Sequence, residues 1–455
     1  MGAKTKSLLI KGAVFLFVVS MSTLSGPLFA FAAKKVVHAW HTEPNPATVS
    51  VMKEIIADFE KLHPDIKIEQ EPISWGDLGA KLMAAVAAGA PPEASHGQTY
   101  MERSFSAKGL LVPIDDVYQS IGEDDIFDTV KRLDYHDGHY YGIAHAIGTD
   151  TLIYRKDIFD AKGLKQPKTW DEWIKVLEAL TEDTDGDGVI DRYGLGLAGL
   201  GFFINEDLYM WVGSNGGRLF DEKGRPTFTE KPVLEMLAFW KKLQDRKVLP
   251  PGWLGHDYLD TFTELAMGKV AMILGWGRGV GFFEQYAPDI ADGDHFNVMW
   301  KPTGPSGKKA LTQLDCEPWM VFKDSKYPNE AKEFLKFFYQ KENYLKYIQS
   351  VPVHFFPILK SVREDPRYKA TPQIKRWQFW TDQQHEYISK GQAQPLLMTE
   401  WDDLELPFIN EIAESGILMD MVTDVLVKDK DPLRAAIDAQ KKAEKLIEKL
   451  GYKKW

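Results

Sequence analysis

The sequence predicts an α/β protein with two domains, and three observations carry this prediction. At 455 residues the chain is too long for one ordinary hydrophobic core. Strand and helix patterns alternate along it, which is the βαβ rhythm of a parallel sheet covered by helices. No tandem repeat or low-complexity linker interrupts the sequence, so the chain is expected to cross between its domains more than once.

The expected elements follow this rhythm in order. "KKVVHAW" (34–40) is a short buried strand, and apolar residues at helical spacing then predict a helix that Pro64 ends. "DIKIEQEPI" (65–73) alternates as a strand, and a second helix stops at a Gly-Ala-Pro-Pro turn. Later segments are expected to be a strand followed by a helix (150–159), an amphipathic helix (169–183), a buried strand (269–276) and two helices of a mostly helical last third (329–340 and 431–452).

The N-terminus predicts secretion. Lysines precede a short apolar run at 12–20, and small residues follow at 30–33, which together form a signal peptide, 1–33, cleaved near Ala32 or Ala33. The run is too short to span a bilayer, although a retained anchor is the alternative. Cys316 is the single cysteine, so neither an intramolecular disulfide nor a lipid-modified N-terminal cysteine is expected. In a bacterium with two membranes the mature protein would be released into the periplasm.

Composition narrows the function. The formal net charge is −11 and no long basic stretch is present, which argues against a nucleic-acid surface. The 14 tryptophans exceed what a core needs. The surplus indicates flat apolar platforms in a binding cleft, although large cores also use tryptophan.

Five segments, in order, resemble the family 1 extracellular solute-binding proteins of ABC importers, which capture sugars. They span nearly the whole mature chain: "FSAKGLLVPIDD" (105–116), "DGHYYGIAHAIGTDTLIYRKDIFDAKGL" (137–164), "PKTWDEW" (167–173), "TELAMGKVAMILGWGRG" (263–279) and "EPWMVFKDSKYPNEAKEFLKFF" (317–338). Two features depart from the family pattern: Ala144 stands where a proline is common, and "ASHGQTY" (94–100) replaces a more apolar strand.

The resemblance implies a periplasmic-binding-protein-like fold of the class II type, with two α/β lobes, a central ligand cleft and three hinge crossings. The crossings would lie near 144–150, 274–277 and 315–318. Lobe 1 would comprise 34–145 plus 277–315, and lobe 2 would comprise 146–276 plus 316–455. The implied function is capture of a carbohydrate, a disaccharide or longer, by hinge closure and its delivery to the permease of an ABC transporter. The protein would act as a monomer, without catalysis and without a required cofactor.

A sugar needs aromatic platforms for its C–H faces and paired hydrogen-bonding groups for its hydroxyls. Trp276 ends a strand at the second crossing, and its flanking glycines are expected to leave one ring face free and to let the hinge rotate. Arg278 could reach a hydroxyl or form a surface salt bridge. Trp40, His41 and Trp75 end strands at the carboxyl edge of the sheet, where ligands of open α/β sheets bind; core packing is the alternative for each.

Other candidates follow from the resemblance. Gln98 and Tyr100 lie in a loop from which the family contributes sugar contacts, with His96 behind them. His145 and Asp150 lie on the first crossing, and Glu317 and Trp319 on the third. Trp211 and Trp401 would add aromatic platforms from lobe 2.

"DTDGDGVID" (183–191) resembles the start of an EF-hand loop. Asp183, Asp185, Asp187 and Asp191 take ligand positions suited to Ca²⁺. Position twelve is Gly194, so the bidentate carboxylate is missing. The expectation is a weak structural calcium site or an Asx turn of solvated carboxylates.

Two other functions remain open. A secreted carbohydrate-active hydrolase would use an acid pair such as Asp402 and Asp403, but the sequence gives that pair no support as a catalytic set, and it contains no nucleophile elbow. A binder of a non-sugar solute on the same fold, such as a peptide or an osmolyte, would use aromatic cages that hold ammonium groups.

Overall fold

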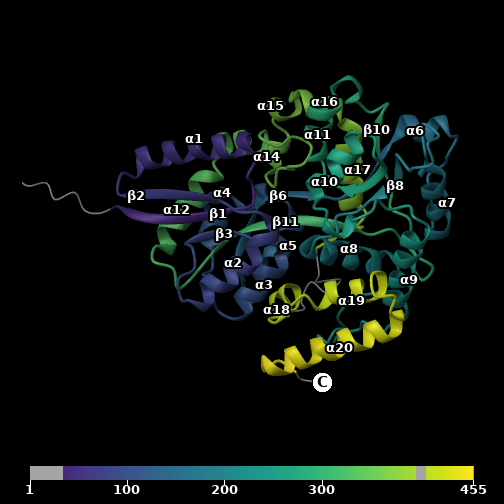
Figure 1. The fold of residues 1–455 in the computed structure, drawn as a ribbon. Coiled ribbons are helices and arrows are strands. Elements are labelled where there is room, and N and C mark those ends of the chain that lie inside the picture. The colour runs from purple at the N-terminus through teal and green to yellow at the C-terminus, as the bar shows by residue number, and fades with distance from the viewer. Residues whose placement is uncertain (1–33, 396–405, 454) are drawn as a thin grey trace, which may run out of the picture.

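The computed structural model describes residues 34–395, 406–453 and 455, and two separate β-sheets organise them (Figure 1). The predicted signal peptide (1–33) and Trp401 lie outside these residues. In Figure 1 the N-terminal elements α1 to α4 lie on the left, α6, α7 and α9 lie on the right, and α19 and α20 lie below. This arrangement confirms the predicted two-lobe α/β fold.

The first sheet is mainly built by the N-terminal part of the chain. Its order is β12-β11-β3-β1-β2, with β6 paired to β11, and β1 runs parallel to both β2 and β3. The hydrogen-bonded pair of β6 and β11 is antiparallel, as is the pair of β3 and β11. The strands are β1 (Lys35–His41), β2 (Ile66–Pro72), β3 (Ala94–His96), β6 (Gly142–Thr149), β11 (Thr312–Val321) and β12 (Ala393–Pro395).

The second sheet has the order β10-β7-β9-β8. Strand β7 is antiparallel to β10 and β9, and β8 is parallel to β9. The strands are β7 (Thr151–Arg155), β8 (Tyr193–Gly196), β9 (Val270–Gly275) and β10 (Phe296–Met299). A small hairpin of β4 (Tyr135–His136) and β5 (His139–Tyr140) stands apart.

Helices that pack with the first sheet or with one another beside it are α1 (Pro46–Leu62), α2 (Trp75–Ala87), α3 (Thr99–Ala107), α4 (Asp115–Ile121), α5 (Asp128–Asp134), α12 (Pro328–Phe338), α13 (Lys341–Ile348), α14 (Lys360–Arg363), α15 (Pro366–Lys369), α16 (Pro372–Arg376) and α17 (Gln378–Ser389). Helices associated with the second sheet are α6 (Lys156–Ala161), α7 (Trp170–Leu180), α8 (Gly201–Ser214), α9 (Lys231–Asp245), α10 (Tyr258–Ala266), α11 (Gly279–Tyr286), α19 (Ile417–Leu426) and α20 (Pro432–Lys449). Helix α18 (Ile409–Glu414) packs against α2, α3 and α8 and so touches both groups.

Local sequence explains where the long helices begin. The Asn45 side chain accepts a hydrogen bond from the Thr48 amide at the start of α1, and Pro46 occupies the first turn, where its missing N–H costs nothing. Thr169 caps α7 in the same way, and Asp431 caps α20. The helices expected at 169–183, 329–340 and 431–452 are therefore confirmed as α7, α12 and α20.

Sheet membership differs from the predicted lobe boundaries. Strand β10 lies within 277–315, which the sequence assigned to lobe 1, yet it pairs with β7 in the second sheet. Strand β11 and helix α12 lie mainly within 316–455, which the sequence assigned to lobe 2. Yet β11 belongs to the first sheet, and α12 packs against that sheet. The chain also stays with the second sheet after β9, so the crossing predicted at 274–277 is wrong. The chain returns to the first sheet between β10 and β11 instead, because β10 pairs with β7 of the second sheet and β11 pairs with β6 of the first.

The first crossing lies where β6 of the first sheet leads directly into β7 of the second, at Asp150. The Asp150 carboxylate forms an ion pair with Lys301. It also accepts hydrogen bonds from the Thr312 hydroxyl and the backbone N–H of Gln313. This set ties the crossing to the start of β11. In the described part of the chain, the helices are too short or too polar to cross a membrane.

Candidate functional site

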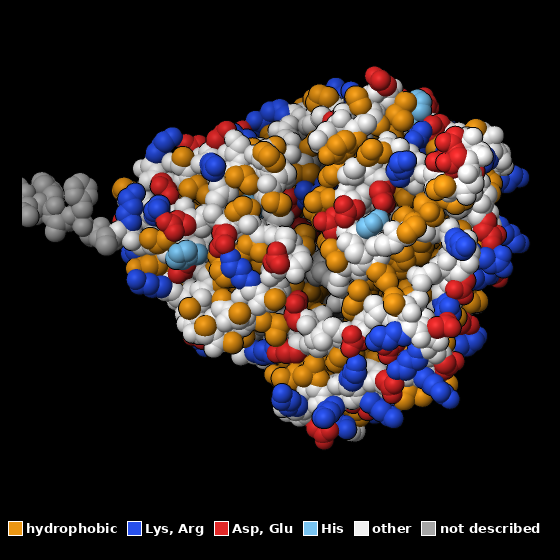
Figure 2. Space-filling model, viewed as in Figure 1, with side chains coloured by type: hydrophobic (Ala, Val, Ile, Leu, Met, Phe, Trp, Pro, Cys, Tyr) orange, Lys and Arg blue, Asp and Glu red, His pale blue; other side chains and the backbone are white. Residues whose placement is uncertain are grey.

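A pocket lies between the two sheets, in the region where Figure 2 shows the molecular surface hollowed between its left and right parts. We call it the inner pocket, and its volume is about 30 Å³. It opens toward a larger cavity of about 580 Å³, with which it shares Trp75, Phe203 and Tyr258. The inner pocket is lined by Trp75, Gln98, Phe203, Glu206, Tyr258, Trp276, Arg278, Asp315, Glu317 and His354.

Both sheets contribute to this lining through the ends of their elements. Trp75 is the first residue of α2, and Gln98 immediately precedes α3, so the first sheet's strand-to-helix turns point them into the pocket. Tyr258 is the first residue of α10. Asp315 and Glu317 both lie on β11, where the register with β6 shifts between Cys316 and Pro318, and both line the pocket.

The aromatic wall is centred on Trp276, which is half-buried in the turn between β9 and α11. The ring of Tyr258 meets it edge-on at 6.2 Å between centroids. A Cβ on Gly277 would lie 2.2 Å from the carbonyl oxygen of Val353. Close backbone packing therefore requires a glycine at this position, while the expectation that the flanking glycines leave a ring face free and let a hinge rotate stays a prediction.

An ion pair lies beside this wall. The Arg278 guanidinium donates to both carboxylate oxygens of Glu43 at 2.8 Å, and Glu43 is fully buried. Burial raises the pKa of Glu43, and the positive charge of Arg278 opposes that rise. Charge-assisted contacts of this kind are strong and fix the guanidinium in place.

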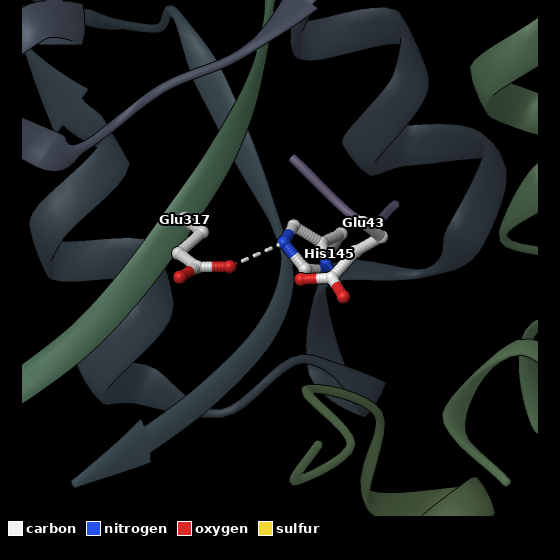
Figure 3. A group of neighbouring side chains, drawn as sticks. All are labelled: Glu43, His145 and Glu317. Carbon is white, nitrogen blue, oxygen red and sulfur yellow. Dashed lines mark hydrogen bonds and ion pairs between the residues drawn. The ribbon is translucent and has the colours of Figure 1, made fainter. Parts of the chain in front are cut away.

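A second polar set lies at the base of the pocket (Figure 3). The His145 ring, from β6, donates from Nε2 to Glu317 on β11 at 2.6 Å, since a carboxylate can only accept. The Tyr347 hydroxyl lies 2.9 Å from the other ring nitrogen, Nδ1, and donates to it. The His96 ring stacks on His145 at 4.0 Å. These contacts hold Glu317 in a defined orientation toward the pocket.

Two further carboxyl groups share one neutral donor. The side-chain amide of Gln313 donates to Asp315 at 2.6 Å and to Glu206 at 3.3 Å. Burial raises the pKa of both carboxyl groups well above their usual range, and the nearby Glu317 adds to each rise. The inner pocket thus concentrates acidic groups in a region shielded from water.

Among the residues that the structure describes, two clusters have metal-like spacing. Ligand atoms of Glu43, His145 and Glu317 lie within 4.8 Å of one another. Here Arg278 already supplies the cation beside Glu43, and the His145 ring nitrogens already have partners. The ion pair with Arg278 and the hydrogen bonds of His145 therefore occupy much of this cluster's ligand capacity.

The second cluster is the acidic loop, in which ligand atoms of Asp183, Asp185 and Asp187 also meet within 4.8 Å. Asp183 accepts hydrogen bonds from the amides of Gly186 and Gly188, as in an Asx turn. Asp191 turns to Thr184, accepting from both its amide and its hydroxyl at 2.7 Å. Calcium binding at this loop stays a prediction.

The structure brings five of the predicted ligand-binding residues into the inner pocket: Trp75, Gln98, Trp276, Arg278 and Glu317. His145 lies directly behind Glu317. Asp150, at the first crossing, is engaged by Lys301 and does not line the pocket.

The remaining described candidates pack elsewhere. Trp40 lies under the Lys81 ammonium, and the His41 ring bonds to Gln70. Three rings are enclosed in hydrophobic cores and leave no face for a ligand; they are Tyr100, Trp211 and Trp319. Trp211, for example, is 4% exposed and stacks on Trp173 at 5.0 Å.

Sequence reasoning missed several lining residues: Phe203, Glu206, Tyr258, Asp315 and His354. The sequence could have indicated Asp315 as a lining residue, because it stands two residues before the predicted site residue Glu317. Phe203 and Glu206 lie in the first two turns of α8, in a stretch whose apolar character looks like core.

Comparison with known proteins identifies relatives of the whole fold. The family model described as bacterial extracellular solute-binding protein matches residues 54–376. An ABC transporter periplasmic-binding protein of Escherichia coli (strain K12) is 21% identical over 437 residues, covering 95% of this chain and 97% of its own.

Two solved structures share the fold. A solute-binding protein from Agrobacterium radiobacter K84, in complex with ribitol, superposes with a TM-score of 0.75 at 21% identity and covers 91% of this chain and 99% of its own. A maltose/maltodextrin-binding domain from Bdellovibrio bacteriovorus, bound to maltotriose, superposes with a TM-score of 0.71 at 22% identity and covers 91% of this chain and 100% of its own.

Proposed function

Because the chain belongs to the family of bacterial extracellular solute-binding proteins, we propose that it captures a carbohydrate for an ABC importer. The family is one of binding proteins, so a binding role without catalysis is the coherent assignment. The fold is shared with proteins whose structures hold ribitol and maltotriose. Both ligands are neutral polyhydroxylated molecules.

The observation that carries the proposal is the make-up of the inner pocket. Its aromatic rings come from both sides of the cleft, with Trp75 on the first sheet's side and Trp276 on the second's. Carboxylate, amide and guanidinium groups lie between them. Rings and polar groups in this combination match the C–H faces and the hydroxyls of a sugar.

The adjoining cavity suggests the size of the solute. At about 580 Å³ it lies within the range of pockets that hold drug-sized ligands. A further cavity of about 460 Å³ shares Tyr258 and Arg278 with the inner pocket. Two larger cavities next to the inner pocket favour a disaccharide or a longer chain.

The mechanism that fits this placement is closure around the solute. A ligand that contacts both lobes stabilises the arrangement in which they approach one another, by its differential contacts with the open and closed forms. A membrane permease would then recognise the closed form. Residues 1–33 would direct the protein to the periplasm and be removed, and the mature protein would act as a monomer without a lipid anchor.

The test is a thermal-shift screen of the purified protein against saccharides of one to four units, followed by titration calorimetry. A ligand at one hundred times its dissociation constant adds about 2.7 kcal/mol to stability, so a rise of several degrees in melting temperature is expected. The bound saccharide should be recovered intact after hours, which separates a binder from a hydrolase. No shift with any saccharide would refute the proposal.

A further inference from the structure

The inner pocket holds three buried carboxyl groups that no lysine or arginine of the described residues pairs with. Glu206, Asp315 and Glu317 all line it, and each is at least 94% buried. They come from two elements on opposite sides of the cleft, α8 and β11. Burying a carboxylate is costly unless a cation or several donors accompany it.

The nearby cations are engaged elsewhere. Arg278 is held by Glu43 through two contacts of 2.8 Å, and Lys301 is held by Asp150. Among the residues that the structure describes, no lysine or arginine forms an ion pair with any of the three pocket carboxyl groups. Glu317 has only the His145 ring as an ionic partner.

The neutral hydrogen-bond donors beside these carboxyl groups are also few. Glu206 and Asp315 share the single amide of Gln313. His354 also lines the pocket; it is 8% exposed, and its Nδ1 has no hydrogen-bond partner among the described residues. Burial and the charge of Arg278 lower the pKa of His354 well below its usual range. The neutral form of the ring is therefore favoured, and its unpartnered Nδ1 can accept a hydrogen bond from an N–H group of a ligand.

The aromatic walls of the inner pocket favour a positively charged ligand group. The rings of Trp75, Phe203, Tyr258 and Trp276 line the same pocket as the acidic side chains. The faces of aromatic rings attract cations, and recognition of ammonium groups by several rings together is a general consequence. Neutral hydroxyls gain nothing from this attraction.

The volume of the inner pocket limits the size of the ligand group that it can hold. About 30 Å³ accommodates roughly two water-sized centres, which suits an ammonium with its attached carbon. The larger cavity beside it can hold the rest of the molecule.

We propose that the solute carries a protonated amino group, as an amino sugar or an aminated polyol does, and that this ammonium binds between Glu206, Asp315 and Glu317. The uncharged body of the solute lies in the adjoining cavity. This inference rests on the proposed function and names the substrate class of the same site. It makes charge, in addition to shape, the basis of selectivity.

The experiment compares matched saccharides by titration calorimetry in low-salt buffer at pH 7 that contains a chelator. Glucose, cellobiose and maltotriose are paired with derivatives aminated at carbon 2, 3 or 6. At least one aminated derivative should bind ten-fold or more tightly than its parent. Glu206→Gln, which keeps the shape of the side chain and removes its ionisable carboxyl group, should reduce that preference, measured as the ratio of the two affinities, at least ten-fold.

Two further variants separate charge from folding. Asp315→Asn should act as Glu206→Gln does, which covers the case in which one variant does not fold. Glu54→Gln removes an exposed carboxylate on α1 that lines neither the inner pocket nor the cavities beside it, and it should leave the preference unchanged.

The outcomes are distinct. If the parents bind as tightly as every aminated derivative, the inference is overturned and the proposed function stands. If no saccharide of either kind binds, the proposed function fails and the inference falls with it. A preference for the amine that survives both Glu206→Gln and Asp315→Asn would also overturn it.

Discussion

Replacing Trp276 with alanine tests whether the aromatic wall of the inner pocket holds the solute. The ring is half-buried at the turn after β9, and it contacts the edge of Tyr258 at 6.2 Å. Its indole nitrogen is buried without a partner among the described residues. The ring packs against the core only in part, so its removal should cost less stability than the removal of a fully buried tryptophan.

The expected magnitude follows from the stacked area. A sugar face that covers roughly 50 Å² of apolar ring surface contributes about 1.2 kcal/mol. Ring stacking adds about 1 kcal/mol beyond the buried area. The sum of about 2 kcal/mol corresponds to a roughly 30-fold weaker dissociation constant.

Titration calorimetry with the tightest saccharide measures this change, and differential scanning calorimetry measures stability. The matched control is Trp211→Phe, in the core of the second lobe, where the ring stacks on Trp173 at 5.0 Å and meets Trp240 at 5.5 Å. This control should lower the melting temperature by several degrees and leave affinity unchanged. An unaltered affinity in Trp276→Ala would remove this ring from the site.

Three other changes test separate parts of the structure. Glu43→Gln deprives the buried Arg278 guanidinium of its charge partner and should cost about 3–5 kcal/mol in urea unfolding; a loss below about 1 kcal/mol would contradict the ion pair's role. Burial, with Glu102 nearby, raises the pKa of Asp134 to about 8, so the folded carboxyl stays protonated while the unfolded one ionises from about pH 4. The free energy of unfolding then falls as pH rises from 4 to 8, and Asp134→Asn should flatten that fall by up to about 1.4 kcal/mol per pH unit in urea titrations at pH 5, 6 and 7; equal slopes would contradict the assignment. Calcium should raise the melting temperature by a few degrees and a chelator should reverse this, with the effect lost in Asp183→Asn; a melting temperature indifferent to calcium would leave the acidic loop as an Asx turn.

Local sequence predicted the elements well because their determinants are local. The helix α7 begins where Thr169 can cap it, and α1 begins at the Asn45 cap. Strand β1 was expected from a short apolar run, and its residues Val37 and Ala39 are fully buried. Each of these features is decided by residues within a few positions of one another.

Strand pairing is decided by residues far apart, and there the prediction was weaker. Strand β10 is some 140 residues from its partner β7 along the chain, and nothing in its own four residues, Phe296–Met299, says which sheet it joins. The lobe boundaries at 277 and 315 failed for this reason.

The candidate site shows the same limit. A tryptophan in a core and one in a cleft have the same sequence signature, since both follow apolar residues. Trp211 is covered by α7 and α9, which supply Trp173 and Trp240, whereas Trp276 lies where two sheets meet and keeps a half-exposed ring. Glu43 was missed because its partner, Arg278, is 235 residues away.

The most direct measurement is a crystal structure of the protein with the tightest saccharide from the screen. The sugar should lie between the two sheets, with one face against Trp276 or Trp75 and its polar groups directed toward Asp315 and Glu317. Density for the saccharide on the outer surface, with the inner pocket and its adjoining cavity filled only by solvent, would contradict the account.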